Sequence, residues 1–394
     1  MVSRARRPLI TANQVTLARL IPMPLLSWLI YRGADLGYRD NAYMWSALIA
    51  GTLIGCTDWI DGLLARKYGP TVLGGMLDPI ADKIFIAFAY TPLVDSHTPL
   101  VPWWTVALLF QREFFVTALR SAYEQRNLTL KTSYLAKAKT WTQMQGMGVA
   151  LLFPLLADHR AFLTWLLVVL VASPIIAMAA LYIIRRTVWR GAWVMAASVL
   201  PILALHLYGD ISLSIWAIML YIVAITWISG LDYLVGGWRK LRGRGDFSRA
   251  DAVRLIGALA LPMLLYKVLI GPAMAWPIFL ILALELAVGG LDNLLSHHHR
   301  ATKALAWGGR VLGVCALLAL ALVVPAYADP LTILAAAVSL VGVSAEFWRG
   351  RDYFLDKRIR DKAQREAAAT PQPFPAAPSE DPRPEADRGA RPDA

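Results

Sequence analysis

Long apolar stretches alternate with short polar turns along almost the whole chain. Each stretch is close to the length of about 20 residues that a helix needs to cross the hydrocarbon core of a bilayer. This pattern predicts an all-α polytopic membrane protein. Twelve membrane-spanning helices are expected, at residues 14–32, 42–64, 80–96, 100–119, 140–157, 161–184, 190–208, 211–236, 251–271, 273–295, 304–326 and 330–348.

Composition agrees with this pattern. Of the 394 residues, 57% are hydrophobic and only 17% are charged, whereas a soluble domain has about 25% charged residues. Twelve spans leave few residues for a soluble domain, which excludes a mainly extramembrane enzyme. The two cysteines, Cys56 and Cys315, both lie in apolar stretches, so no disulfide framework is expected.

The net charge of +12 follows the predicted topology. Cytoplasmic turns of membrane proteins carry an excess of Lys and Arg, so this charge does not indicate nucleic-acid binding. With a cytoplasmic N-terminus, every second turn faces inward, and these turns hold many more basic residues than the opposite turns do: Arg66, Lys67, Arg120, Arg126, Lys131, Lys137, Lys139, Arg185, Arg186, Arg190, Arg239, Lys240, Arg242, Arg244, Arg300 and Lys303. We therefore expect a multi-pass protein of the inner (cytoplasmic) cell membrane with both termini in the cytoplasm.

Three regions are expected from these changes in composition. Residues 1–190 hold the first six spans, and residues 191–354 hold further helical hairpins of unknown role. Residues 355–394 are rich in charged residues, proline and alanine and have little to bury, which predicts a disordered cytoplasmic tail. The basic residues near the start of the chain precede an apolar stretch without a clear cleavage site, which predicts a retained first span rather than a removed signal peptide.

The second region has a regular feature of its own. Asp232, Asp292 and Asp352 close the eighth, tenth and twelfth predicted spans and are spaced by 60 positions both times. A repeated helical hairpin would produce this period, and so would helix-end residues on unrelated hairpins of similar length. Glu285 is the one candidate for a polar site in this half, because ionisable residues within spans are rare and costly.

One cluster of acidic residues stands out in the first region. On a helix, positions three and four apart share a face, so Asp58 and Asp61 line one side of the second span. Asp78 and Asp82 share a face of the third span in the same way, and the pair Asp78-Pro79 suits the N-cap and first turn of that helix. Two helices are thus expected to present four carboxylates at the cytoplasmic edge of the membrane.

Four converging carboxylates require cations to neutralise them. Ligand sets made only of oxygen atoms select hard divalent ions, so Mg²⁺ or Mn²⁺ is expected. Gly62 and Ala65 leave the helix surface bare for a bulky group, and Arg66 supplies a fork for phosphate. A diphosphate bridged by two metal ions fits this set, with one carboxylate left to take a proton from an attacking alcohol.

The spacing of these residues is D-x2-D-G-x2-A-R-x7-G-x3-D-x3-D, and it resembles the motif of the CDP-alcohol phosphatidyltransferase family at all eight fixed positions. The resemblance implies that Asp58, Asp61, Asp78 and Asp82 bind a pair of metal ions and that Asp82 is the general base. It also implies a six-helix transmembrane bundle, usually a homodimer, with an active site open to the cytoplasm. The residues expected to border the CDP group are Gly62, Ala65, Arg66 and Gly74.

Segments outside the motif resemble the phosphatidylglycerophosphate synthase branch of this family, over roughly residues 8–186. They are Asn13, Thr16 and Arg19 in the first helix, the run from Arg112-Glu113 to Arg120 in the fourth, and Lys137-Ala138-Lys139 before the fifth. The resemblance implies CDP-diacylglycerol and glycerol 3-phosphate as substrates. Four basic residues are candidates for binding the acceptor phosphate: Arg112, Arg120, Lys137 and Lys139. Glu113 is expected to be a salt-bridge partner rather than a second base.

Two alternatives remain open at this point. Ala12 and Ala136 stand where the branch usually has Pro and Gly, which leaves room for a sister enzyme that uses phosphatidylglycerol, an inositol phosphate or serine as acceptor. The further helices are also compatible with a transport or scaffold protein without catalysis. Loss of CMP release on mutation of any of the four aspartates would favour the enzyme.

Overall fold

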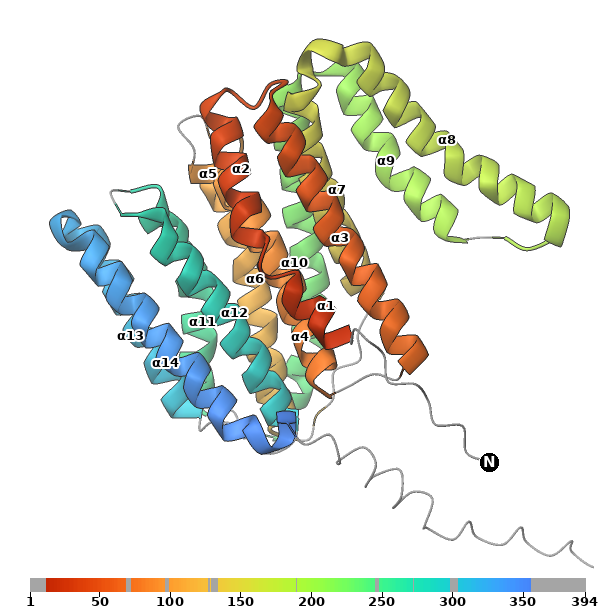
Figure 1. The fold of residues 1–394 in the computed structure, drawn as a ribbon. Coiled ribbons are helices and arrows are strands. Elements are labelled where there is room, and N and C mark those ends of the chain that lie inside the picture. Colours follow the sequence, from red (N-terminus) through yellow and green to blue (C-terminus); the bar gives the residue numbers. More distant parts are fainter. Residues whose placement is uncertain are drawn as a thin grey trace, which may run out of the picture. The chain divides into compact units, whose positions relative to one another are not determined.

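The computed structural model describes residues 12–68, 72–95, 99–126, 128, 134–188, 190–244, 248–271, 273–297 and 304–355. Within these residues every regular element is a helix (Figure 1). The elements are α1 (Ala12–Ala18), α2 (Met23–Asp35), α3 (Ala42–Tyr68), α4 (Val72–Tyr90), α5 (Pro92–Asp95), α6 (Trp103–Glu124), α7 (Tyr134–Leu155), the 3₁₀ turn η1 (Ala157–His159), α8 (Arg160–Arg185), α9 (Arg190–Tyr208), α10 (Ile211–Arg244), α11 (Arg249–Leu269), α12 (Ala275–His297), α13 (Ala304–Val323), the 3₁₀ turn η2 (Pro325–Tyr327) and α14 (Ala328–Leu355). The predicted all-α fold is confirmed.

A helix is present at each of the predicted spans, but the first one is broken. Residues 19–22 form a turn between α1 and α2. Pro22 lacks an N–H group, and its ring clashes with the carbonyl of the residue four positions earlier, so the helix cannot continue through it. This break separates a short α1 from the longer α2, and it places the residues of α1 at the candidate site described below.

The expected start of the third span is wrong. Helix α4 begins at Val72 rather than near residue 80, so Asp78 and Pro79 lie inside the helix and not at its N-terminus. The apolar and small residues that precede Asp78 continue the helix backward, and the missing N–H of Pro79 costs this helix one hydrogen bond. Gly74 is consequently a buried position within α4.

The described residues contain six helices that are long and apolar enough to cross a membrane. They are Ala42–Leu64, Ala157–Arg185, Ile211–Leu231, Arg249–Leu269, Ala275–Ser296 and Pro325–Asp352, and shorter apolar helices lie at Met195–Tyr208 and Gly308–Val323. Helix α4 carries three charged residues, Asp78, Asp82 and Lys83, and α6 carries Arg112, Glu113 and Arg120. These charged residues of α4 and α6 lie at or beside the candidate site described below.

Helices from the second half of the chain pack directly on those from the first half. Helix α6 lies against α10, α11 and α12, while α12 also packs on α4, and α10 also packs on α7. Helix α8 packs chiefly against α9. Residues 1–350 accordingly form one compact unit, and Figure 1 shows α6 between helices from both halves of the sequence.

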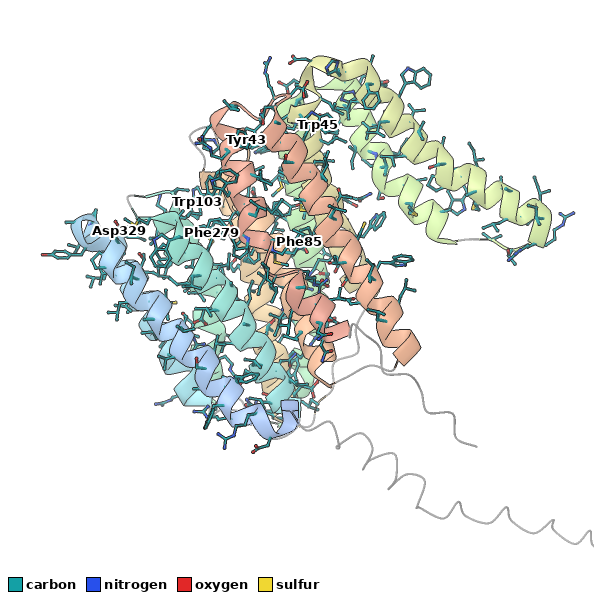
Figure 2. The ribbon with its side chains drawn as sticks, viewed as in Figure 1. Tyr43, Trp45, Phe85, Trp103, Phe279 and Asp329 are labelled. Carbon is teal, nitrogen blue, oxygen red and sulfur yellow. The ribbon has the colours of Figure 1, made fainter. Side chains whose placement is uncertain are left out.

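Buried aromatic side chains fill the space between these helices. Phe279 of α12 contacts Phe88 of α4, with ring centroids 5.2 Å apart, and Phe85 of α4 is also buried. Figure 2 labels Phe279 and Phe85 among the side chains of the packed helices. Phe110 of α6 stacks with Tyr266 of α11 at 6.1 Å. These contacts join the first and second halves of the chain through apolar packing.

Glycines allow some of these helices to approach closely. A Cβ atom added at Gly290 of α12 would lie 2.5 Å from Cγ1 of Ile80 on α4. At Gly313 of α13, in contrast, an added Cβ would have nothing within 4 Å. The α4–α12 contact therefore depends on the absence of a side chain at Gly290.

Gly290→Ala is expected to destabilise the protein by about 1–3 kcal/mol, because the added methyl group forces Ile80 and the neighbouring helix to move. Thermal unfolding of the detergent-solubilised protein measures the effect. Gly313→Ala is the matched control, and it should be neutral or stabilising by up to about 1 kcal/mol because alanine favours the helix. Equal melting temperatures for the two variants would contradict the close packing of α4 and α12.

Buried ion pairs also link the helices. Arg254 of α11 binds Asp292 of α12 with 2.9 Å between Nη2 and Oδ2, and both side chains are almost fully buried. Glu285, the predicted polar candidate of this half, pairs with Arg310 of α13. Asp292 is thus buried, whereas Asp352, at the equivalent position of the 60-residue period, is exposed. Equal spacing does not give these two aspartates equivalent surroundings.

Some predictions fall on residues that the structure does not describe. The tail from residue 356 onward is one of them, and the side chain of Asp232 is another.

Candidate active site

The four predicted aspartates come together at one end of the bundle. Asp58 and Asp61 lie on α3, and Asp78 and Asp82 lie on α4. The guanidinium group of Arg19, which follows α1, lies among them. Its Nη1 is 2.8 Å from Oδ1 of Asp58, and its Nη2 is 3.1 Å from Oδ1 of Asp82. The faces predicted from helical spacing therefore meet in space.

Helix α1 completes this acidic cluster with a second residue. The Thr16 hydroxyl lies 3.1 Å from Oδ2 of Asp61 and 2.9 Å from Oδ1 of Asp78. Arg19 also donates to the backbone carbonyl of Asp78 at 3.1 Å. Arg19 directly follows α1, and its backbone N–H donates to the Val15 carbonyl at 3.0 Å, so it continues the helical turn on the same side as Thr16. The break at Pro22 lets this short helix lie against the carboxylates.

The donor set fits a hard divalent cation. Four carboxylates and one guanidinium leave three formal negative charges, and oxygen ligands of this type favour Mg²⁺ or Mn²⁺. The side chains of Asp58 and Asp82 are 53% and 40% exposed, so ions in solution can reach them. Among the described residues, no three His, Cys, Asp or Glu side chains are grouped closely enough to hold a metal ion. Arg19 and Thr16 contact the carboxylate oxygens of the cluster.

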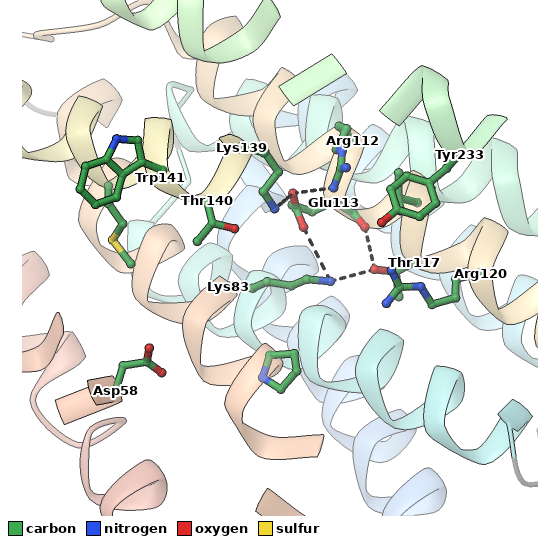
Figure 3. A pocket seen from close by; sticks show the side chains of 13 residues that line it. Asp58, Lys83, Arg112, Glu113, Thr117, Arg120, Lys139, Thr140, Trp141 and Tyr233 are labelled. Atoms are coloured by element: carbon green, nitrogen blue, oxygen red, sulfur yellow. Dashed lines mark hydrogen bonds and ion pairs between the residues drawn. The ribbon is translucent and has the colours of Figure 1, made fainter. Parts of the chain in front are cut away.

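A pocket of about 670 Å³ opens beside this cluster (Figure 3). Helices α3, α4, α6, α7 and α10 all contribute to its wall. The lining residues are Asp58, Pro79, Lys83, Arg112, Glu113, Val116, Thr117, Arg120, Lys139, Thr140, Trp141, Met144 and Tyr233. Four of them are basic and two are acidic, so the pocket favours an anionic ligand.

Glu113 is the centre of the charged groups in this pocket. Its carboxylate lies 2.5 Å from Nζ of Lys139 and 3.2 Å from Nη1 of Arg112. Nζ of Lys83 is 3.8 Å away on the other side and donates to the Thr117 hydroxyl at 2.8 Å. Figure 3 shows these side chains converging on Glu113. The prediction that Glu113 is a salt-bridge partner agrees with this geometry, and three cations around one carboxylate leave positive charge for a ligand.

A smaller cavity of about 160 Å³ shares lining residues with the main pocket and also includes Asp82 of the acidic cluster. It is lined by Asp82 from the acidic cluster and by Lys83, Glu113, Lys139 and Gln143, among others. A small anionic molecule in the main pocket can therefore extend a polar group toward the Asp82 carboxylate.

Some of the remaining predicted site residues are described by the structure, and the side chains of others are not. Gly62 lies on α3 directly after Asp61, and Gly74 is buried on α4. Three of the predicted phosphate-binding residues, Arg112, Arg120 and Lys139, line the same pocket. The side chains of Ala65, Arg66 and Lys137 lie outside the described part of the structure.

Sequence reasoning missed Lys83 and Tyr233, and it gave no role to Arg19 at the centre of the acidic cluster. Lys83 is a charged residue within a predicted span, and the rule that singled out the aspartates applies to it equally. Tyr233 lies near the end of a predicted span, where an aromatic residue is usually an interfacial anchor. Its place in the pocket follows only from the packing of α10 on α6.

Comparison with known proteins identifies the family. The pattern of the CDP-alcohol phosphatidyltransferase family matches residues 9–173. A CDP-diacylglycerol–glycerol-3-phosphate 3-phosphatidyltransferase of Bacillus subtilis is 33% identical over 147 residues, which are 36% of this chain and 75% of that protein. The chain belongs to the CDP-alcohol phosphatidyltransferase family. As a member it is a phosphatidyltransferase, and the matched region includes all eight motif residues from Asp58 to Asp82.

Other relatives of this phosphatidyltransferase carry similar names. A probable phosphatidylglycerophosphate synthase of Mycobacterium tuberculosis is 37% identical over 142 residues, 36% of this chain and 65% of that protein. A CDP-diacylglycerol–glycerol-3-phosphate 3-phosphatidyltransferase of Pseudomonas fluorescens is 33% identical over 164 residues, 39% of this chain and 76% of that protein. No solved structure matches the chain. Helices α9–α14 lie beyond the region matched by the family pattern.

Proposed function

We propose that this phosphatidyltransferase transfers the phosphatidyl group of CDP-diacylglycerol to glycerol 3-phosphate, with phosphatidylglycerol phosphate and CMP as products. The observation that carries the proposal is the pocket with excess positive charge directly beside the acidic cluster. An acceptor that already bears a phosphate matches this pocket. The names of the relatives from Bacillus subtilis and Pseudomonas fluorescens support the same reaction.

Asp82 is the proposed general base. Its carboxylate lies in the small cavity that shares lining residues with the cationic pocket, so it can take the proton of the primary hydroxyl of glycerol 3-phosphate. That oxygen attacks the β-phosphorus of CDP-diacylglycerol and forms the new phosphodiester bond. The bond between the β-phosphorus and the bridging oxygen breaks, and CMP leaves with that oxygen.

Asp58, Asp61, Asp78 and Asp82 would hold the two divalent ions, Mg²⁺ or Mn²⁺. When bound, such ions neutralise charge on the phosphoryl oxygens of a diphosphate. Arg19 lies within reach of the same carboxylates and would have to give up part of these contacts when the ions bind. Gly62, Ala65, Arg66 and Gly74 would border the CDP group, as the family motif implies.

The acceptor phosphate would lie among Arg112, Arg120 and Lys139, with Lys137 as a further candidate from the sequence. Lys83 adds a fourth described cation to the wall of this pocket. The three charges on Arg112, Lys139 and Lys83 exceed the single negative charge of Glu113, so a phosphate adds the missing negative charge without displacing an ion pair.

The basic residues of alternate turns support an active site and termini that face the cytoplasm, in the inner cell membrane. The family resemblance supports a homodimer.

The proposed function is tested by an acceptor screen with the purified full-length protein. CMP release from CDP-diacylglycerol is measured in Mg²⁺ buffer with glycerol 3-phosphate, phosphatidylglycerol, inositol phosphate and serine offered separately. Glycerol 3-phosphate should give the highest kcat/KM. Preference for one of the other acceptors would assign the protein to a sister activity, and no CMP release with any acceptor would favour a transport or scaffold role.

A further inference from the structure

Helix α10 presents one continuous face to α6. Thr226, Ser229, Gly230 and Tyr233 are spaced by three or four positions, so they line the same side of the helix. Trp227 anchors this contact, because its indole N–H donates to the carbonyl of Leu108 at 3.1 Å. All of these α10 residues lie beyond the region matched by the family pattern.

This face holds the Arg112 side chain. Nε of Arg112 donates to the Thr226 carbonyl at 3.1 Å, and Nη2 donates to the Ser229 hydroxyl at 2.9 Å. Ser229 in turn donates to the Thr226 carbonyl at 2.7 Å. A Cβ atom at Gly230 would lie 3.1 Å from Cγ of Arg112. The arginine therefore lies flat against α10, at a position without a side chain.

Arg112 retains donors for a ligand in this arrangement. A guanidinium group has five N–H donors. Its hydrogen bonds to described residues, namely Thr226, Ser229 and Glu113, use three of them. Two N–H groups are thus left for an anion in the pocket that Arg112 lines.

Tyr233 connects the two arginines of the pocket. Its ring centroid lies 5.9 Å from Cζ of Arg112 and 5.7 Å from Cζ of Arg120. Both distances are within the range of a cation–π interaction. The tyrosine is buried and belongs to the pocket wall, and Figure 3 shows its ring beside Arg112 and above Arg120.

We propose that α10 forms part of the acceptor site, with Ser229 and Tyr233 as positioning residues that aim Arg112 and Arg120 at the phosphate of the acceptor. This inference rests on the proposed use of a phosphate-bearing acceptor. It assigns a role to a helix outside the matched family region, and it makes acceptor binding dependent on the second half of the chain.

The test compares steady-state kinetics of full-length variants with the wild type. Ser229→Ala should raise the KM for glycerol 3-phosphate about tenfold, the size expected for one hydrogen bond to a charged group of roughly 1.4 kcal/mol. The KM for CDP-diacylglycerol should not change, and Ser229→Thr, which keeps the hydroxyl, should restore most of the acceptor affinity. Tyr233→Leu should raise the acceptor KM about fivefold, whereas Tyr233→Phe, which keeps the aromatic ring, should raise it less.

Two controls separate positioning from a loss of stability. Tyr221→Leu removes an exposed tyrosine from the same helix and should leave both KM values unchanged. Melting temperatures are recorded for every variant. An unchanged acceptor KM in Ser229→Ala and Tyr233→Leu would overturn the proposal, and so would a parallel rise of both KM values that follows the melting temperature. If Ser229→Ala does not fold, the comparison of Tyr233→Phe with Tyr233→Leu decides.

The same experiment distinguishes this inference from the proposed function. If the wild type prefers inositol phosphate to glycerol 3-phosphate, the proposed function fails, yet the variants should still raise the KM for that phosphate-bearing acceptor. If the wild type uses only serine, the requirement for a phosphate fails and the role assigned to α10 fails with it.

Discussion

Replacing Asp82 by asparagine is expected to lower the rate of CMP release by about 10²–10⁴-fold, because asparagine keeps the size of the side chain but cannot accept the proton of the acceptor hydroxyl. Asp82 combines contact with the Arg19 guanidinium at 3.1 Å with a place in the cavity that shares lining residues with the cationic pocket. Initial rates at saturating CDP-diacylglycerol and glycerol 3-phosphate measure the change.

Asp158→Asn is the control for this experiment. Asp158 forms an exposed ion pair with Arg39 at 3.3 Å and lines none of the described pockets of the site. Its variant should release CMP at the rate of the wild type. Near-full activity of Asp82→Asn would remove Asp82 from the role of general base and leave the acidic cluster with metal binding alone.

Arg254→Met is expected to destabilise the protein by about 3–5 kcal/mol, because it leaves the Asp292 carboxylate buried without the guanidinium that binds it. The side chains of Arg254 and Asp292 are 0% and 1% exposed, so water cannot replace the lost partner. Thermal or denaturant-induced unfolding of the detergent-solubilised protein measures the loss.

The double variant Arg254→Met/Asp292→Leu tests whether the unpaired buried charge of Asp292 causes the loss of stability. It removes both charges together, so it should recover most of the lost stability, since apolar residues of similar volume can replace a buried ion pair. Asp158→Asn again serves as the control, because the loss of an exposed ion pair costs at most about 1 kcal/mol. A double variant as unstable as Arg254→Met would show that packing rather than charge explains the effect.

The acidic cluster was predictable from the sequence because the aspartates of each pair are only a few positions apart. Asp58 and Asp61 are three positions apart, and Asp78 and Asp82 are four positions apart, so helical periodicity alone places each pair on one face. Intramembrane charge is also costly enough that its position indicates function. The helices themselves were predictable for a similar reason, since each span has to satisfy its own backbone hydrogen bonds in the bilayer.

Long-range packing was not predictable in the same way. Arg19 contacts residues about 40–60 positions away in the sequence, and Tyr233 meets Arg112 across 121 positions. Neither residue carries a local signal of the partner it will find. The start of α4 was misplaced because Asp78-Pro79 has the composition of a helix N-terminus, while the apolar residues before it extend the helix in the folded protein.

The flat contact between Arg112 and the α10 face has a practical consequence for enzyme engineering. Positions 226, 229, 230 and 233 contact Arg112 from α10 and leave the four aspartates intact. Randomising these four positions should yield active variants with altered acceptor preference, on a helix that lies beyond the region matched by the family pattern.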